Sequence, residues 1–148
     1  MDSLRVISMF AGIGGICLGF KQAGFDIVWA NELNFAACKT YRHNFGVNYI
    51  VEGDIRKIDA DKIPDFDILI AGFPCQSFSI GGKQKGFDDN RGILFFEITR
   101  VISVKNPQVV FLENVENLME HDRGRTFLVI YNTLAARLLC SLSSDAYI

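Results

Sequence analysis

Short segments rich in Val, Ile and Leu alternate along this chain with amphipathic segments that have helical spacing. The predicted strands are residues 4–10, 25–31, 48–54, 66–72 and 108–114. The predicted helices are residues 14–24, 34–46, 93–105 and 125–139. This alternation predicts one α/β domain over residues 1–148, a doubly wound parallel sheet covered on both faces. We expect the strand order 3-2-1-4-5.

Residues with special backbone preferences mark several predicted helix ends. Asn34 has the side chain of an N-cap, and Gly46 is placed to end the same helix. Gly24 is placed to end the first helix, and Pro107 stops the helix that starts at residue 93.

The composition is that of an ordinary globular protein with a real core. The chain has 148 residues, of which 49% are apolar and 22% are charged. Its formal net charge is −2, so overall electrostatics do not indicate a nucleic-acid partner. Any such partner must be argued from a site.

The cysteines Cys17, Cys38, Cys75 and Cys140 form no C-x-x-C pair, and no His lies at zinc-ligand spacing from them. This pattern indicates neither a zinc site nor a disulfide framework and favours reduced thiols in a cytoplasm. The apolar and glycine run at residues 9–20 is too short for a bilayer, which needs roughly 20 residues. We therefore expect neither a metal nor a membrane partner.

The unusual residues of the sequence fall at the carboxyl ends of the predicted strands. In doubly wound sheets ligands bind at that edge, at the switch point between strands one and four. The residues that the fold brings there are Phe10 to Gly15, Glu32, Asp54, Pro74, Cys75, Glu113 and Asn114.

The glycines at positions 12, 14 and 15 join the first strand to the first helix. They fit either a tight turn or a nucleotide site, where bare backbone approaches a ligand. Glu32 stands where an acid binds ribose in dinucleotide folds, and Asp54 is placed to bind an adenine amino group. The pattern G-x-G-G matches the NAD fingerprint imperfectly, since Cys17 occupies its third position. The residues thus predict an adenosine-type cofactor without deciding which one.

Cys75 follows Pro74 at the end of a predicted central strand, where proline forces the chain out of the sheet. This setting favours a reactive thiol over an inert core residue, whereas the other three cysteines lie in helical patterns and are expected in the core. Glu113 ends an apolar strand, so it is either paired structurally or a proton donor whose pKa is raised by burial. Together Cys75 and Glu113 form a candidate nucleophile and acid.

Three stretches in this order resemble the cytosine-C5 DNA methyltransferases of bacterial restriction-modification systems. They are "FAGIGG" (10–15), "GFPCQSFS" (72–79) and "ENV" (113–115), and the linking residues 81–98 are also similar. The resemblance covers residues 4 to about 134. It implies the Rossmann-like fold of S-adenosylmethionine-dependent methyltransferases, here incomplete.

The resemblance implies S-adenosyl-L-methionine as methyl donor. Phe10 and the residues after it would hold its methionine part, Glu32 its ribose, and Asp54 with Ile55 its adenine. The complete set of implied cofactor residues is Phe10, Ala11, Gly12, Ile13, Gly14, Gly15, Glu32, Leu33, Asp54, Ile55, Gly72, Pro74 and Leu94. Leu33 departs from the family, which often has an aromatic residue packed on the adenine at this position.

The resemblance also implies cytosine in double-stranded DNA as the methyl acceptor. The Cys75 thiolate would add to C6 of a flipped cytosine while Glu113 protonates or hydrogen-bonds N3. Residues 76–91 are expected to form a mobile loop at the DNA. The implied DNA-binding residues are Gln76, Ser79, Lys83, Arg91 and Asn114.

The later family motifs, a target-recognition region and a returning segment that completes the cofactor domain do not occur in the sequence. The tail "AARLLCSLSSDAYI" after residue 134 departs from the family. We therefore expect the isolated chain not to methylate DNA specifically, and to self-associate or pair with a complementing C-terminal chain. Two alternatives stay open, a non-catalytic remnant that binds S-adenosylmethionine and an NAD-dependent oxidoreductase.

Overall fold

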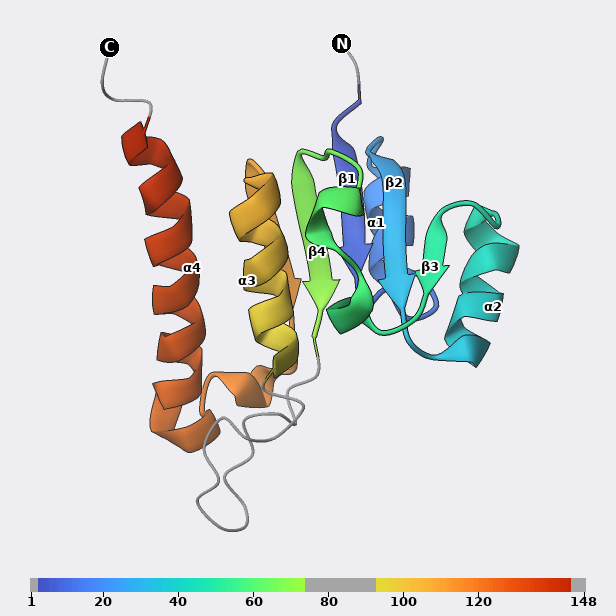
Figure 1. Ribbon diagram of the computed structural model, residues 1–148. Coiled ribbons are helices and arrows are strands. Elements are labelled where there is room, and N and C mark those ends of the chain that lie inside the picture. The colour runs from blue at the N-terminus through green and yellow to red at the C-terminus, as the bar shows by residue number, and fades with distance from the viewer. Residues whose placement is uncertain (1–2, 74–92, 145–148) are drawn as a thin grey trace. The chain divides into compact units, whose positions relative to one another are not determined.

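Five parallel strands form one sheet in the computed structural model, which describes residues 3–73 and 93–144 (Figure 1). The strands are β1 (Arg5–Met9), β2 (Asp26–Glu32), β3 (Ile50–Glu52), β4 (Ile68–Gly72) and β5 (Val109–Glu113). Their order is β3-β2-β1-β4-β5, and every neighbouring pair is parallel. The predicted α/β fold and strand order are both confirmed.

The chain divides into two compact units, and the sheet belongs to the first. The first unit comprises residues 1–72 and 107–113 and also contains the helices α1 (Gly15–Gln22) and α2 (Phe35–Phe45). Short 3-10 turns η1 (Ile55–Lys57) and η2 (Ala60–Lys62) connect β3 to β4. The second unit comprises residues 73–106 and 114–148.

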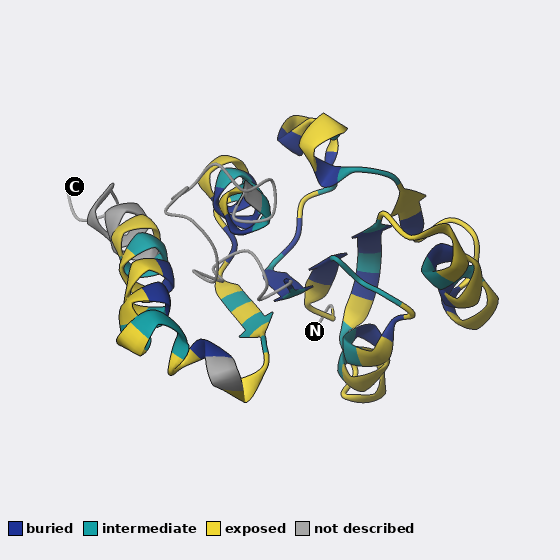
Figure 2. Cartoon of the chain, turned by 90° about the horizontal axis from the view of Figure 1, so that it is seen from below, coloured by how far each residue is buried: buried dark blue, intermediate teal, exposed yellow. Residues whose placement is uncertain are grey.

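The core of the first unit lies between one face of the sheet and the inner sides of α1 and α2. Its buried members are Val6, Cys17, Ile27, Ala30, Cys38, Tyr41, Phe45, Ile50, Ile68 and Ile70. Each helix buries a stripe of residues and exposes the rest, as Figure 2 shows. The predicted core role of Cys17 and Cys38 is confirmed, since both are fully buried.

Two of the predicted helix ends are confirmed in atomic detail. The Oδ1 atom of Asn34 accepts a hydrogen bond from the backbone N–H of Ala37 at 3.0 Å and so caps α2. Gly46 ends the same helix with a φ of 97°, a conformation that L side chains rarely adopt.

The second unit contains the helices α3 (Ile93–Lys105) and α4 (Arg125–Ser144), with the 3-10 turns η4 (Glu116–Leu118) and η5 (His121–Gly124) before α4. Nη1 of Arg137 donates to Ser103 Oγ at 2.7 Å and ties α4 to α3. The bounds of α3 are those predicted from the sequence, whereas α4 continues past the predicted residue 139. Among residues 3–73 and 93–144, no helix is both long and apolar enough to cross a membrane.

The fifth strand is more exposed than its apolar sequence predicts. Val109 is 49% exposed and Phe111 is 45% exposed, although both belong to a strand expected to be buried. The expectation was wrong because β5 is an edge strand of the sheet. Apolar composition reports that a strand belongs in a sheet, but its place within the sheet decides how far it is covered.

Candidate active site

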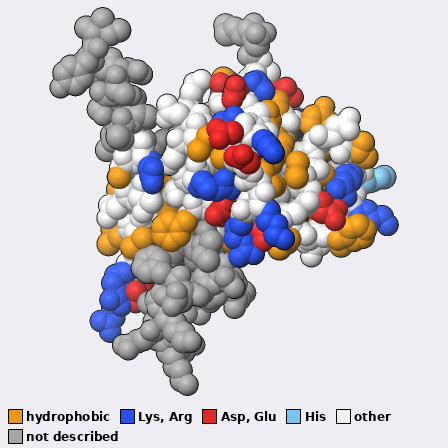
Figure 3. Space-filling model, viewed as in Figure 1, with side chains coloured by type: hydrophobic (Ala, Val, Ile, Leu, Met, Phe, Trp, Pro, Cys, Tyr) orange, Lys and Arg blue, Asp and Glu red, His pale blue; other side chains and the backbone are white. Residues whose placement is uncertain are grey.

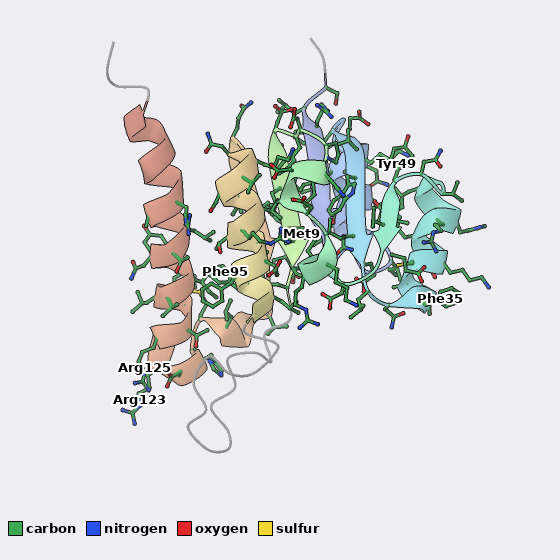
Figure 4. The ribbon with its side chains drawn as sticks, viewed as in Figure 1. Met9, Phe35, Tyr49, Phe95, Arg123 and Arg125 are labelled. Atoms are coloured by element: carbon green, nitrogen blue, oxygen red, sulfur yellow. The ribbon has the colours of Figure 1, made fainter. Side chains whose placement is uncertain are left out.

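The segment between β1 and α1 is a tight turn built from left-handed residues. Phe10, Gly12 and Gly14 have φ angles of 56°, 55° and 94°. The backbone N–H of Gly14 donates to Ala11 O at 3.0 Å and closes the turn. A left-handed φ is strained for a bulky residue, so Phe10 keeps it only because the surrounding structure imposes it. Phe10 directly follows Met9, the last residue of β1 (Figure 4).

Gly14 is required by packing as well as by backbone geometry. A Cβ atom at this position would lie 2.3 Å from Phe45 Cε2 and 3.1 Å from Tyr41 Cδ2. Tyr41 and Phe45 stack on each other in α2, so α1 begins directly against that helix. Gly14 also has no side chain to cap α1, which leaves the first N–H groups of the helix for another partner.

The carboxylate of Glu32 is fastened to the glycine turn. Its Oε2 accepts from the backbone N–H of Gly12 at 2.9 Å, and its Oε1 accepts from the backbone N–H of Asn34 at 2.8 Å. A carboxylate has about four acceptor positions, so each oxygen keeps a lone pair for a further donor. Glu32 is therefore oriented by the protein and still able to accept from a hydroxyl.

Asn31, which the sequence analysis did not select, connects the same turn to the end of β3. It is 1% exposed, and its Nδ2 donates to Val51 O at 3.0 Å and to Gly53 O at 2.9 Å. Its backbone carbonyl accepts from the N–H of Ala11 at 3.0 Å. The available signal was a polar residue at the end of an otherwise apolar strand.

Asp54 begins η1 at the same edge and is paired with Arg56. Its carboxylate accepts from the backbone N–H of Arg56 at 3.0 Å and from the guanidinium, with Nη2 at 2.5 Å from Oδ2. Hydrogen bonds from the Arg56 side chain and backbone lower the pKa of Asp54 to about 2. Asp54 is thus a permanently charged acceptor at neutral pH.

Two further predicted cofactor residues differ in exposure. Ile55, the neighbour of Asp54, is 2% exposed, whereas Leu33 is 67% exposed.

The carboxyl ends of β4 and β5 bring the predicted acid to a glycine. Gly72 pairs with Glu113 in the strand register, and a Cβ at Gly72 would lie 3.2 Å from Glu113 Oε2. Glu113 is exposed, so the burial that one of its two predicted roles assumed is not found. The cause is the edge position of β5.

Glu113 also borders an apolar groove within the first unit. The groove has a volume of about 360 Å³ and lies between α1 and β5. Its lining includes Ile16, Phe20, Phe25 and Phe111 beside Glu113. The Glu113 carboxylate therefore lies on the same face of the sheet as α1.

Asn114, the residue after β5, holds the chain that leaves β4. Its Nδ2 donates to Phe73 O at 2.7 Å, and its Oδ1 accepts from the backbone N–H of Val115 at 2.9 Å. Phe73 precedes Pro74 and Cys75 in the sequence. The side chain of Asn114 is therefore engaged with the backbone that enters the predicted nucleophile segment.

Several predicted site residues either belong to the second unit or lie outside the described residues. Leu94 is the second residue of α3 in the second unit. Those outside the described residues are Pro74, Cys75, Gln76, Ser79, Lys83 and Arg91. Cys38, by contrast, is described, and burial raises the pKa of its thiol, as expected for an inert core cysteine.

Basic and acidic side chains interleave on the face of the molecule shown in Figure 3. Two arginines of the first unit are paired with acids, Arg42 with Glu52 at 2.8 Å and Arg56 with Asp54. Arg123 of η5 and Arg125, the first residue of α4, lie close together (Figure 4), and Arg125 pairs with Asp122. Within the part of the chain that the structure describes, no cluster of His, Cys, Asp and Glu is arranged to hold a metal ion.

Known proteins are similar to this chain in sequence. The family described as C-5 cytosine-specific DNA methylase matches residues 4–137. The type II methyltransferase M.Bsp6I of Bacillus sp. (strain RFL6) is 55% identical over 133 residues, which cover 88% of this chain and 42% of that protein. M.HhaI of Haemophilus parahaemolyticus is 50% identical over 134 residues, covering 90% of this chain and 40% of that protein.

A solved structure agrees with the fold. A putative DNA modification methyltransferase encoded within a prophage of E. coli has a TM-score of 0.74 and 30% identity, covering 90% of this chain and 38% of that one. The chain thus spans less than half the length of the relatives it matches. The extent of the family match shows that this chain belongs to the C-5 cytosine-specific DNA methylase family.

Proposed function

We propose that this chain is the cofactor-binding and catalytic part of a DNA (cytosine-5-)-methyltransferase. It would bind S-adenosyl-L-methionine and act on a cytosine flipped out of double-stranded DNA. The observation that carries the proposal is the hydrogen-bonded connection of the 10–15 turn, Glu32 and the Gly53–Asp54 turn at one sheet edge. Because relatives are more than twice as long, the activity of the whole enzyme is part of the proposal.

The donors and acceptors at this edge fit an adenosylated amino acid. Gly12 and Gly15 have nothing within 4 Å of where a Cβ would stand, so the turn offers open backbone to a ligand. Glu32 would accept from the ribose hydroxyls, and Asp54 would accept from the adenine amino group. When bound, the cofactor supplies an electrophilic methyl group on a sulfonium.

The carboxyl ends of β4 and β5 would supply the chemistry on cytosine. The Cys75 thiolate adds to C6 and forms a C–S bond, which makes C5 nucleophilic. Glu113 protonates or hydrogen-bonds N3 and so stabilises the negative charge that develops on the ring. After methylation, loss of the C5 proton and expulsion of the thiolate restore the aromatic ring. The exposure of Glu113 is compatible with this role, since the acid must reach a base that enters from solvent.

Asn114 supports this arrangement through the backbone. Its hydrogen bond to Phe73 O fixes the chain two residues before Cys75, so we assign it to positioning the nucleophile segment. Contacts with DNA stay predictions for Asn114 and for the residues Gln76, Ser79, Lys83 and Arg91.

A calorimetric titration with S-adenosylhomocysteine, run beside NAD, tests the cofactor. We expect binding of S-adenosylhomocysteine alone, because Glu32 and Asp54 are already oriented at an open glycine turn. Binding of NAD alone would overturn the proposal and favour the oxidoreductase alternative. Binding of neither would show that this chain lacks a complete cofactor pocket.

Covalent trapping separates an enzyme from a non-catalytic remnant. The chain is combined with a segment that carries the remaining family motifs and is incubated with DNA containing 5-fluorocytosine. A protein–DNA adduct that depends on Cys75 supports catalysis. Cofactor binding without any adduct would identify a remnant. Self-association, association with a complementing chain and a bacterial cytoplasmic location stay predictions.

A further inference from the structure

We propose that Asn31 is a positioning residue of the cofactor pocket, which sets the turn that presents Asp54. The inference rests on the proposed S-adenosylmethionine site. It assigns no contact with the cofactor to Asn31. The side chain instead acts through the backbone of residues 51–53.

The hydrogen bonds of Asn31 use both protons of one carboxamide. Nδ2 donates to Val51 O at 3.0 Å and to Gly53 O at 2.9 Å. A primary amide nitrogen has two protons, so the two bonds satisfy its donor capacity. Aspartate, which has nearly the same shape, offers no donor when ionised. The site therefore requires an amide and not only a side chain of this size.

The two carbonyl acceptors lie at the point where β3 ends. β3 stops at Glu52, and Gly53 has a φ of 148°, a conformation that side chains rarely adopt. The N–H of Gly53 donates to Glu32 O at 2.9 Å. Both the N–H and the carbonyl of Gly53 are therefore hydrogen-bonded to the end of β2. Asp54 comes directly after this turn. The backbone that leads into Asp54 is consequently held by the two bonds to Asn31 and the bond to Glu32, while Arg56 holds the Asp54 carboxylate.

The same residue reaches the glycine turn through its backbone. Asn31 O accepts from the N–H of Ala11 at 3.0 Å. In the strand register Asn31 stands between Met9 of β1 and Val51 of β3. One residue that is 1% exposed therefore connects the methionine end and the adenine end of the proposed pocket.

The loss of two hydrogen bonds explains why the amide matters. Removing the carboxamide of Asn31, a residue that is 1% exposed, leaves Val51 O and Gly53 O without this donor. Val51 is exposed and Gly53 is half-buried, so the turn can replace the lost bonds with bonds to water by shifting outward. That movement displaces Asp54 while leaving the strands β1 and β4 unchanged.

The experiment compares Asn31→Ala, Asp54→Ala and the double variant by calorimetry with two ligands. The first is S-adenosylhomocysteine, and the second is S-inosylhomocysteine, in which an oxo group replaces the adenine amino group. We expect Asn31→Ala to weaken the first ligand about 10-fold and the second by less than about 2-fold. In the Asp54→Ala background, Asn31→Ala should change affinity for the first ligand by less than about 2-fold.

A matched control uses an amide at the opposite edge of the sheet. Nε2 of Gln108 donates to Asp67 Oδ1 at 3.1 Å, so Gln108→Leu removes a side-chain amide hydrogen bond far from the strand carboxyl ends. It should leave both affinities within about 2-fold of the original chain. Equal losses for both ligands in Asn31→Ala, or additive losses with Asp54→Ala, would overturn the positioning role.

Amide hydrogen exchange in the free chain keeps the inference separate from the cofactor proposal. Asn31→Ala should speed exchange of the Gly53 N–H by at least about 10-fold relative to the Ile7 N–H in the central strand. If the chain binds neither ligand, the cofactor proposal fails and this ratio alone decides the role of Asn31. An unchanged ratio would overturn it.

Discussion

The carboxyl ends of β1, β2 and β3 differ from those of β4 and β5. At the first three, backbone and side chains are linked by hydrogen bonds from Gly12 to Glu32, from Ala11 to Asn31 and from Asn31 to Gly53. At the last two, Asn114 Nδ2 donates to Phe73 O, and Glu113 is exposed beside Gly72. The Glu32 carboxylate is thus held by two hydrogen bonds before any ligand arrives, whereas the Glu113 carboxylate is open to solvent.

This difference matches the two proposed tasks. A cofactor of constant shape is recognised best by a rigid, preformed cradle. A base that leaves a duplex must enter an open site, so its acid has to be accessible. The contrast predicts that substitutions at the ends of β1, β2 and β3 alter stability and cofactor affinity. Substitutions at the ends of β4 and β5 should instead alter adduct formation and the rate of methyl transfer.

The largest expected effect comes from the nucleophile. Cys75→Ala should abolish the covalent adduct with 5-fluorocytosine DNA in the chain complemented by the remaining family motifs, since no other thiol is proposed to add to C6. Gel analysis of the adduct measures this. Cys17→Ala is the control, because Cys17 is fully buried in α1 and should leave the adduct in place. An adduct that persists without Cys75 would place the chemistry elsewhere.

Gly14→Ala should be the most destabilising change at the cofactor end. The new methyl would stand 2.3 Å from Phe45 Cε2, and a φ of 94° is unfavourable for alanine. Overpacking and backbone strain together predict a loss of about 3 kcal/mol in the free energy of unfolding. Urea denaturation measures the loss.

Gly19→Ala is the matched control for that experiment. Gly19 lies in α1 with nothing within 4 Å of its Cβ position, so alanine should stabilise the chain by about 0.5–1 kcal/mol. Similar effects of the two substitutions would mean that α1 does not begin against α2 as described.

Gly72→Ala tests the catalytic end without removing a charged group. The added methyl would lie 3.2 Å from Glu113 Oε2 and 3.6 Å from Ile16, so the carboxylate has to shift. We expect methyl transfer by the complemented enzyme to slow about 10-fold. Gly72 is among the cofactor residues that the resemblance implies, but the added methyl would face Glu113 and Ile16. Affinity for S-adenosylhomocysteine should therefore fall less than the rate of methyl transfer. A loss of cofactor affinity with unchanged turnover would remove the distinction between the two halves of the edge.

The smallest expected effect concerns the pair of half-buried Asp54 and exposed Arg56. Hydrogen bonds from the Arg56 side chain and backbone lower the pKa of Asp54 to about 2, below the ordinary 3.8. The stabilisation is therefore present above about pH 4 and is lost as the pH falls toward 2. Arg56→Gln should lower the free energy of unfolding by about 0.5 kcal/mol at pH 7. The two stability curves should converge near pH 2, and a gap that widens on acidification would contradict this.

Local sequence patterns predicted most helix ends, because each end depends on neighbouring residues. The strand order was predicted from the general topology of doubly wound sheets once strands and helices were seen to alternate. Asn34 and Gly46 bound α2 for reasons contained within a few positions. The roles of Asn31 and Arg56 could not be predicted in the same way. Asn31 depends on where β3 ends, about 20 residues later, and Arg56 depends on the conformation of η1. The exposure of β5 follows from its edge position, which the predicted strand order already contained, and not from its composition.

The central place of β1 has a consequence for how the chain acquires its fold. β1 pairs with β2, which is made soon afterwards, and with β4, which begins only at Ile68. Until that point is synthesised, one edge of the innermost strand has no partner. Closing so long a segment is entropically slow, so formation of the sheet should be limited by the arrival of β4. The strand that is made first is thus completed late, and the apolar residues of β1 are the ones that need protection during synthesis.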